Sequence, residues 1–175
     1  MSLKQAQAAC ECNLFGTPTG QSNFDDASDV ELGVKFIPSI NGTISGVRFY
    51  KQGSMGGTHV GRLWQSDGTP MANATFTETA SGWQSVTFSS PVSVTAGTTY
   101  VASVTFNDGR YIATPNYFTT SVTNGPLTAP SGPSVGNGVF TGNAGSFPTT
   151  ASGNHANYWV DVAFYATDPP TVVSV

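Results

Sequence analysis

The stretch Val30-Glu31-Leu32-Gly33-Val34-Lys35-Phe36 alternates apolar and polar residues, and the alternation returns in Tyr158-Trp159-Val160-Asp161-Val162-Ala163-Phe164. Successive side chains of a β-strand point to opposite faces, so this period of two predicts strands with one buried face. Similar runs between these two predict strands over residues 30–37, 42–51, 59–66, 70–78, 83–88, 92–95, 98–106, 111–113 and 158–166. We therefore expect an all-β fold, a two-sheet antiparallel sandwich of jelly-roll-like form with about nine strands.

The segment from Thr114 to Asn157 breaks this pattern, because it is rich in Gly, Pro, Asn, Ser and Thr. A segment of this length without regular structure is unusual inside a compact domain. We expect it either to pack over a sheet face or to carry function. Its anchors are predicted to be Tyr111, Tyr117, Phe118, Phe140 and Phe147.

Charge and hydropathy exclude two classes of partner. Charged residues make up 9% of the 175 residues and the net charge is −4. Nucleic-acid binding requires a dense basic patch, which six scattered Lys and Arg do not form. No apolar run approaches the roughly 20 residues that cross a bilayer. We predict neither a nucleic-acid partner nor membrane insertion.

The two ends of the chain predict an excised module. Residues 1–13 are expected to be a polar tail whose Met1-Ser2-Leu3 is typical of a cloning remnant. Cys10 and Cys12 are too close in sequence for a favourable mutual disulfide, and alone they supply half a metal site, so their role stays open. Residues 14–166 are expected to form the sandwich. Residues 167–175 are expected to be a linker and the start of a neighbouring β domain.

Six blocks in order carry a resemblance to a known family: Val30–Phe36, Gly46–Lys51, Gly57–Trp64, Gly82–Phe88, Gly97–Ser103 and Asn157–Phe164. Over residues 14–166 they resemble a bacterial extracellular module catalogued as a domain of unknown function. The resemblance implies a place in long secreted or cell-surface proteins, beside immunoglobulin-like repeats and polymer-degrading domains. It implies no activity of its own. A second likeness, to carbohydrate-binding jelly rolls, is at the level of the fold only.

Acidic residues on the outward faces of the terminal strands suggest a calcium site. If the first and last strands are neighbours, Glu31 and Asp161 converge, and an acidic loop precedes the first strand. Ca²⁺ accepts six to eight oxygen ligands in irregular geometry, and carbohydrate-binding jelly rolls often hold one in a comparable place. The alternative is solvated carboxylates, or a surface pair of Glu31 with Lys35. The predicted structural calcium ligands are Glu31, Asp161, Asp25, Asp26 and Asp29.

Three aromatic residues, Trp83, Trp159 and Tyr165, are out of phase with the apolar face of their strands. Exposed Trp and Tyr rings stack against the C–H faces of sugars, so these three are the candidate ligand-binding residues. The alternative is that the rings are buried beneath the 114–157 segment. Trp64 adjoins Leu63 and is assigned to the core.

Catalytic signals are weak. Gly132-Pro133-Ser134-Val135-Gly136 matches the G-x-S-x-G pattern, but a nucleophile elbow needs a strand before it and a helix after it. His59 and His155 have no nucleophile nearby in sequence and are assigned to surface or turn positions. Glu31 and Asp161 as a glycosidase pair are a third, distant alternative.

These observations predict a non-catalytic accessory module of a secreted or cell-surface multidomain bacterial protein. The leading expectation is binding of a carbohydrate or other polymer, with a polysaccharide as partner. A structural spacer or adhesion module without a small ligand is the alternative, and a glycoside hydrolase is third.

Overall fold

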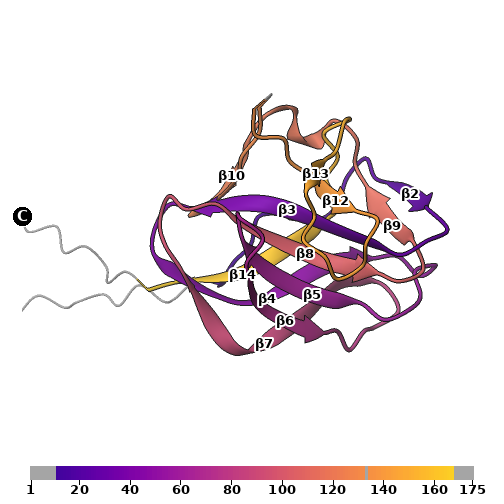
Figure 1. Ribbon diagram of the computed structural model, residues 1–175, viewed down its shortest axis with the longest axis horizontal. Helices are drawn as coiled ribbons and strands as arrows, with labels where there is room; N and C mark the ends of the chain where they lie inside the picture. The colour runs from indigo at the N-terminus through magenta and orange to yellow at the C-terminus, as the bar shows by residue number, and fades with distance from the viewer. Residues whose placement is uncertain (1–10, 133, 168–175) are drawn as a thin grey trace, which may run out of the picture.

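The computed structural model describes residues 11–132 and 134–167 as two antiparallel sheets packed face to face (Figure 1). The smaller sheet has the order β1 (Glu11–Cys12), β14 (Val160–Ala166), β4 (Gly42–Lys51) and β7 (Gly82–Val94). The larger has the order β10 (Val122–Asn124), β11 (Leu127–Ala129), β3 (Val30–Pro38), β8 (Tyr100–Phe106), β5 (Val60–Gln65) and β6 (Pro70–Thr75).

Three smaller elements complete the described part of the chain. β12 (Val139–Thr141) pairs with both β3 and β13 (Thr150–Ala151). β2 (Ser22–Asp25) and β9 (Arg110–Ala113) form a separate two-stranded ribbon. A single 3-10 turn, Tyr117–Thr119, is the helical structure present between residues 11 and 167. No helix in this part of the chain is long and apolar enough to cross a membrane.

The core lies between the two sheets and follows from the alternation in sequence. Apolar residues at every second position of β3, β8, β4 and β14 point inward and are almost fully buried. Aromatic rings interlock across the layer, with Phe49 meeting Phe76 and Phe106 edge-on at 4.9 and 5.4 Å between centroids. These inward residues include Leu32, Val34, Phe36, Ala102, Val104, Val47, Phe49, Val160, Val162 and Phe164.

The predicted all-β sandwich is confirmed, but the number of strands was underestimated. Residues 11–132 and 134–167 form fourteen strands rather than about nine. The 114–157 segment contains β10, β11, β12 and β13, which have only two or three residues each and therefore leave little alternation in sequence. Conversely, the two strands expected over 83–88 and 92–95 are one long strand, β7.

The predicted pairing of the first and last strong strands was wrong. β3 pairs with β8, β11 and β12 in the larger sheet, whereas β14 pairs with β1 and β4 in the smaller one. Both strands are long and apolar on one face because each contributes to the same core from opposite sides. The alternation in sequence establishes that each strand has a buried face, and it leaves the pairing partner open.

The boundaries expected at the ends are tested only in part. Residues 11 and 12 belong to β1, paired with Tyr165 and Phe164, so they are not part of a tail. Cys12 is disulfide-bonded. Cys10, the other residue of the spacing argument, lies outside the described residues. The rest of the expected tail with its cloning remnant, and the expected linker and following domain beyond residue 167, lie outside the described residues.

Candidate functional site

The outer face of the larger sheet carries a buried polar network centred on Glu31, whose side chain is 0% exposed. Ser103 Oγ and Thr105 Oγ1 on β8 donate to its carboxylate at 2.6 and 2.5 Å. Arg62 on β5 lies 3.1 Å away as the counter-ion. The backbone N–H of Gly145, in the 114–157 segment, donates to the same carboxylate at 2.9 Å. The Glu31 carboxylate therefore helps to hold the 114–157 segment against the sheet.

Beside this network lies a second apolar cluster outside the main core. It consists of Trp64, Val101 and Val139, with Phe147 packed against it. Trp64 donates its Nε1–H to Ser103 Oγ at 2.8 Å and meets the Phe147 ring at 5.7 Å. The 114–157 segment thus covers one sheet face with its own hydrophobic contacts. Phe147 is confirmed as one of its anchors, and Trp64 belongs to this outer cluster rather than to the main core.

The free edge of β3 is completed by three different pieces of the 114–157 segment. β12 pairs with residues 31–33 and β11 with residues 37–38. Between them the side chain of Asn137 takes the place of a strand, since its Oδ1 accepts from Lys35 N at 2.9 Å and its Nδ2 donates to Lys35 O at 3.0 Å. This arrangement fixes the backbone of Lys35 at the margin of the covered area.

A groove of about 460 Å³ opens at that margin. We call it the Lys35 groove. Val101, Phe147 and Pro148 supply its apolar lining, with the Phe147 side chain half-buried and so partly open to solvent. Its polar lining consists of Lys35 and the hydroxyl-bearing residues Ser66, Thr99, Ser134 and Thr149, and Val135 completes the rim.

Lys35 is held at this site by a hydrogen bond from its Nζ to the Val135 carbonyl at 2.5 Å. Burial lowers the pKa of its ammonium from the ordinary 10.5. The expected surface pair of Lys35 with Glu31 does not form, because Arg62 is the counter-ion of Glu31. The alternation in sequence placed Lys35 on the outward face correctly, but gave no sign of a groove.

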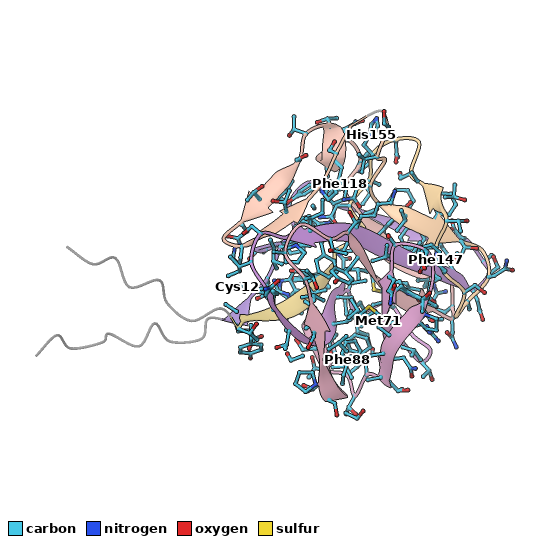
Figure 2. All side chains as sticks on the ribbon, turned by 60° about the vertical axis from the view of Figure 1, so that its left-hand side comes forward. Cys12, Met71, Phe88, Phe118, Phe147 and His155 are labelled. Atoms are coloured by element: carbon cyan, nitrogen blue, oxygen red, sulfur yellow. The ribbon has the colours of Figure 1, made fainter. Side chains whose placement is uncertain are left out.

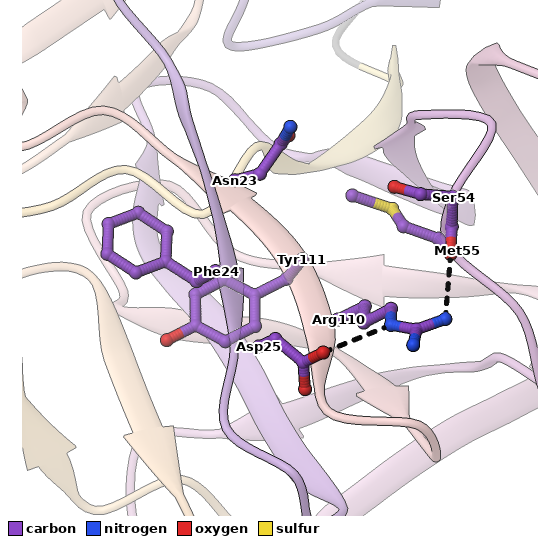
Figure 3. Close-up of a pocket in the computed structure, with 7 residues that line it drawn as sticks. All are labelled: Asn23, Phe24, Asp25, Ser54, Met55, Arg110 and Tyr111. Atoms are coloured by element: carbon purple, nitrogen blue, oxygen red, sulfur yellow. Dashed lines mark hydrogen bonds and ion pairs between the residues drawn. The ribbon is translucent and has the colours of Figure 1, made fainter.

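A second, smaller hollow of about 200 Å³ lies beside the β2–β9 ribbon (Figure 3). Arg110 spans it, with Nε 3.2 Å from the Asp25 carboxylate and Nη1 3.3 Å from the Ser54 carbonyl. Phe24 and Tyr111 stack at 5.4 Å between centroids, and their register puts them on the other side of the ribbon from Asp25 and Arg110. Both charged side chains are about half exposed, so the ion pair is weak.

Asp161 is the second fully buried carboxylate, and it lies on the outer face of the smaller sheet. The backbone N–H groups of Leu14 and Phe15 donate to it at 2.8 and 3.0 Å, and Arg48 Nη2 lies at 2.7 Å. Burial raises the pKa of Asp161, and the Arg48 charge opposes that shift. Asp161 thus holds residues 14–15 against the outer face of the smaller sheet. Glu31 holds Gly145 against the outer face of the larger sheet in the same way.

The proposed calcium ligands are not brought together. Glu31 and Asp161 lie on opposite outer faces of the sandwich, each with an arginine counter-ion. Asp25 pairs with Arg110, Asp26 accepts from the Tyr111 hydroxyl at 3.1 Å, and Asp29 is exposed. Within residues 11–132 and 134–167 no three acidic, His or Cys side chains gather as a metal site. Calcium binding stays a prediction, which melting curves with and without chelator test.

The three candidate aromatic platforms have different surroundings. Trp159 is 1% exposed, packed against Phe15 and Tyr117, so it offers no free ring face and the platform interpretation fails for it. Trp83 is half-buried, with the Arg48 guanidinium 4.0 Å from its ring centroid. Tyr165 is half-buried and donates its hydroxyl to Glu11 at 2.6 Å. The predicted burial beneath the 114–157 segment is confirmed for Trp159, since Tyr117 belongs to that segment.

The histidines were predicted as surface or turn residues, which is wrong for His59. Its side chain is 0% exposed between the rings of Phe49 and Phe106, and its Nδ1 lies 2.6 Å from the Glu78 carboxylate. Lys51 pairs with the same carboxylate at 2.6 Å. His155 does close a turn, since its backbone N–H donates to the Ser152 carbonyl at 3.1 Å.

Taken together, these features define an all-β sandwich domain. The 114–157 segment covers the outer face of its larger sheet, and the Lys35 groove lies at the margin of the covered area. Residues 16–160 match the family model described as a domain of unknown function, DUF4082, and the chain belongs to this family. No curated protein matches the chain.

Proposed function

We propose that this domain is a non-catalytic module that binds polysaccharide in the Lys35 groove, as part of a secreted or cell-surface multidomain bacterial protein. The observation that carries the proposal is the lining of that groove. A half-buried phenyl ring, Phe147, and four hydroxyl-bearing residues line a hollow of about 460 Å³. Sugar rings present apolar C–H faces and a hydroxyl rim, so this combination of surfaces suits them.

The path of the chain favours a ligand-binding module over a structural spacer between neighbouring domains. Glu11 of β1 pairs with Tyr165 of β14, so the chain enters and leaves the described body at one edge. A spacer adds length between its neighbours when the chain enters at one end and leaves at the other. In the view of Figure 2, Cys12, which lies at that edge, and Phe147, which lines the groove, are on opposite sides of the body.

The surroundings of the candidate catalytic groups support a non-catalytic role. Ser134 of the G-x-S-x-G stretch lines the groove with Lys35, yet the structure gives no hydrogen bond between them, and Lys35 donates to the Val135 carbonyl instead. Glu31 and Asp161 lie on opposite outer faces, whereas a glycosidase pair must flank one bond within about 10 Å.

The test is binding of the 175-residue chain to a polysaccharide panel, followed by calorimetry on any positive polymer. Phe147→Ala is expected to weaken binding about tenfold or more, because loss of an aromatic stacking surface removes its contact area. Trp83→Ala, a half-buried aromatic change on the other sheet, is the matched control and should leave affinity unchanged. A blank panel favours the spacer or adhesion alternative. Loss of binding in Trp83→Ala alone moves the site to the smaller sheet.

A further inference from the structure

The distribution of positive charge singles out Lys35. Five of the six Lys and Arg lie in the described residues, and four of these form ion pairs with carboxylates. Lys35 is the one described cation for which no carboxylate partner is present within residues 11–132 and 134–167. In a chain of net charge −4, an unpaired lysine facing a groove is a local reversal of the overall charge.

The position of Lys35 suits recognition better than general solubility. One proton of the ammonium is directed to the Val135 carbonyl, and an ammonium has three donors, so two remain for a ligand. The Asn137 side chain holds the Lys35 backbone through both its N–H and its C=O. The lysine is therefore positioned before any ligand arrives, which reduces the entropy lost on binding.

We infer that the Lys35 groove selects an acidic polysaccharide, one with a singly charged carboxylate or sulfate ester on its sugar, and that Lys35 binds this anionic group. The inference rests on the proposed function. One ammonium neutralises one negative charge, and the groove lining contains no arginine that would form a bidentate clamp on a more highly charged group. Around the charge, the side-chain hydroxyls of Thr99 and Thr149 are placed for sugar hydroxyls, and Phe147 for the ring face.

The desolvation of Lys35 strengthens this interpretation. Burial disfavours the isolated charge, as its lowered pKa shows, and an anionic ligand compensates that cost. A neutral sugar would leave the ammonium partly desolvated and without a counter-ion. Charge selectivity is therefore expected to reside in this residue, while the apolar contacts contribute equally to acidic and neutral polymers.

The experiment compares polygalacturonate, its neutral methyl ester, dextran sulfate and dextran in calorimetric titrations of the whole chain. Lys35→Met is expected to weaken binding of an acidic polymer about tenfold or more, the usual scale for one charged hydrogen bond. Lys35→Arg should retain part of the affinity. Arg110→Met, at the hollow beside the β2–β9 ribbon, makes the same change in net charge and should have no effect.

Each outcome decides the matter. Preference for polygalacturonate over its methyl ester identifies a carboxylate as the bound group. Preference for dextran sulfate over dextran identifies a sulfate ester. Either preference supports the inference when Lys35→Met abolishes it. Equal binding of acidic and neutral polymers, or equal losses in Lys35→Met and Arg110→Met, overturns the inference and leaves the proposed function intact. No binding to any polymer overturns both. Melting temperatures of the variants, expected to match that of the parent, exclude misfolding.

Discussion

The Glu31 carboxylate accepts a hydrogen bond from the backbone N–H of Gly145, 114 residues further along the chain, at 2.9 Å. Because the Glu31 side chain is fully buried, this hydrogen bond joins the strand pairs of β11 and β12 in holding the covering segment to the sheet beneath it. Phe147, two residues beyond Gly145, reaches the Lys35 groove from that tie point. The shape of the groove therefore depends on a charge that lies outside it.

We predict that Glu31→Gln lowers both stability and binding. Removing one partner of a buried ion pair leaves Arg62 without its counter-ion, and the free energy of unfolding should fall by about 3 kcal/mol. Urea unfolding measures this loss. Hydrogen exchange at the Gly145 amide should accelerate more than exchange in β14 or β4. Unchanged exchange at Gly145 would show that the hydrogen bond does not hold the segment.

Asp161→Asn is the counterpart on the smaller sheet, and it is expected to lower stability without affecting the groove. The carboxylate accepts from Leu14 and Phe15 and pairs with Arg48, so its loss should also cost about 3 kcal/mol in urea unfolding. The matched control is Asp29→Asn, at an exposed acidic residue, which should change stability by less than about 0.5 kcal/mol. Equal effects of the two variants would contradict the role given to Asp161.

Two tryptophan variants test how deeply each ring is buried. Trp159→Ala should lower the free energy of unfolding by about 3–5 kcal/mol, since the ring is 1% exposed and its loss leaves a cavity. Trp83→Ala removes a half-buried ring and its contact with Arg48, at a cost of about 1–2 kcal/mol. Chemical denaturation measures both values. A larger loss in Trp83→Ala than in Trp159→Ala would reverse this assignment.

Gly138→Ala is expected to disrupt the covering segment. A Cβ at Gly138 would lie 1.9 Å from the Ala156 carbonyl oxygen, and the residue has φ of +70°, which costs a non-glycine residue about 1–2 kcal/mol before any clash. We expect a loss of at least about 2 kcal/mol in thermal or urea unfolding. Gly142→Ala has open space around its Cβ and no left-handed φ, so it should be nearly silent.

The lowered pKa of Lys35 predicts a pH effect with a definite sign. The folded state holds the Lys35 proton less tightly than the unfolded state, whose pKa is near 10.5. As pH rises from the lowered pKa towards 10.5, the unfolded state binds more protons and the free energy of unfolding increases. Over the same range an acidic polymer should lose affinity as Lys35 loses its charge. Unfolding and binding curves of the parent and Lys35→Met across this range measure both changes.

Much of the scaffold was predictable from local pattern. The runs around Val34 and Val162 predicted buried strand faces, and both faces are in the core. The same alternation put Glu31, Lys35 and Asp161 on outward faces, which is where they lie. The short strands β10 to β13 were missed because a strand of two or three residues is too short to show a period of two. The pairing of β3 with β14 was wrongly expected. The alternation shows that a strand has a buried face, and it does not show which strand forms hydrogen bonds with it.

The sequence by itself determined a sandwich of antiparallel strands, with one apolar face per strand, because side-chain direction depends only on the local backbone. The tertiary structure decided what became of the outward residues. From the sequence alone, Glu31 and Asp161 could have been metal ligands. In the structure they are buried acceptors, because the backbone N–H groups of Gly145, Leu14 and Phe15 donate to them. Lys35 became the lining of a groove because residues 100 positions away along the chain close around it, and long-range contacts of this kind leave no local pattern.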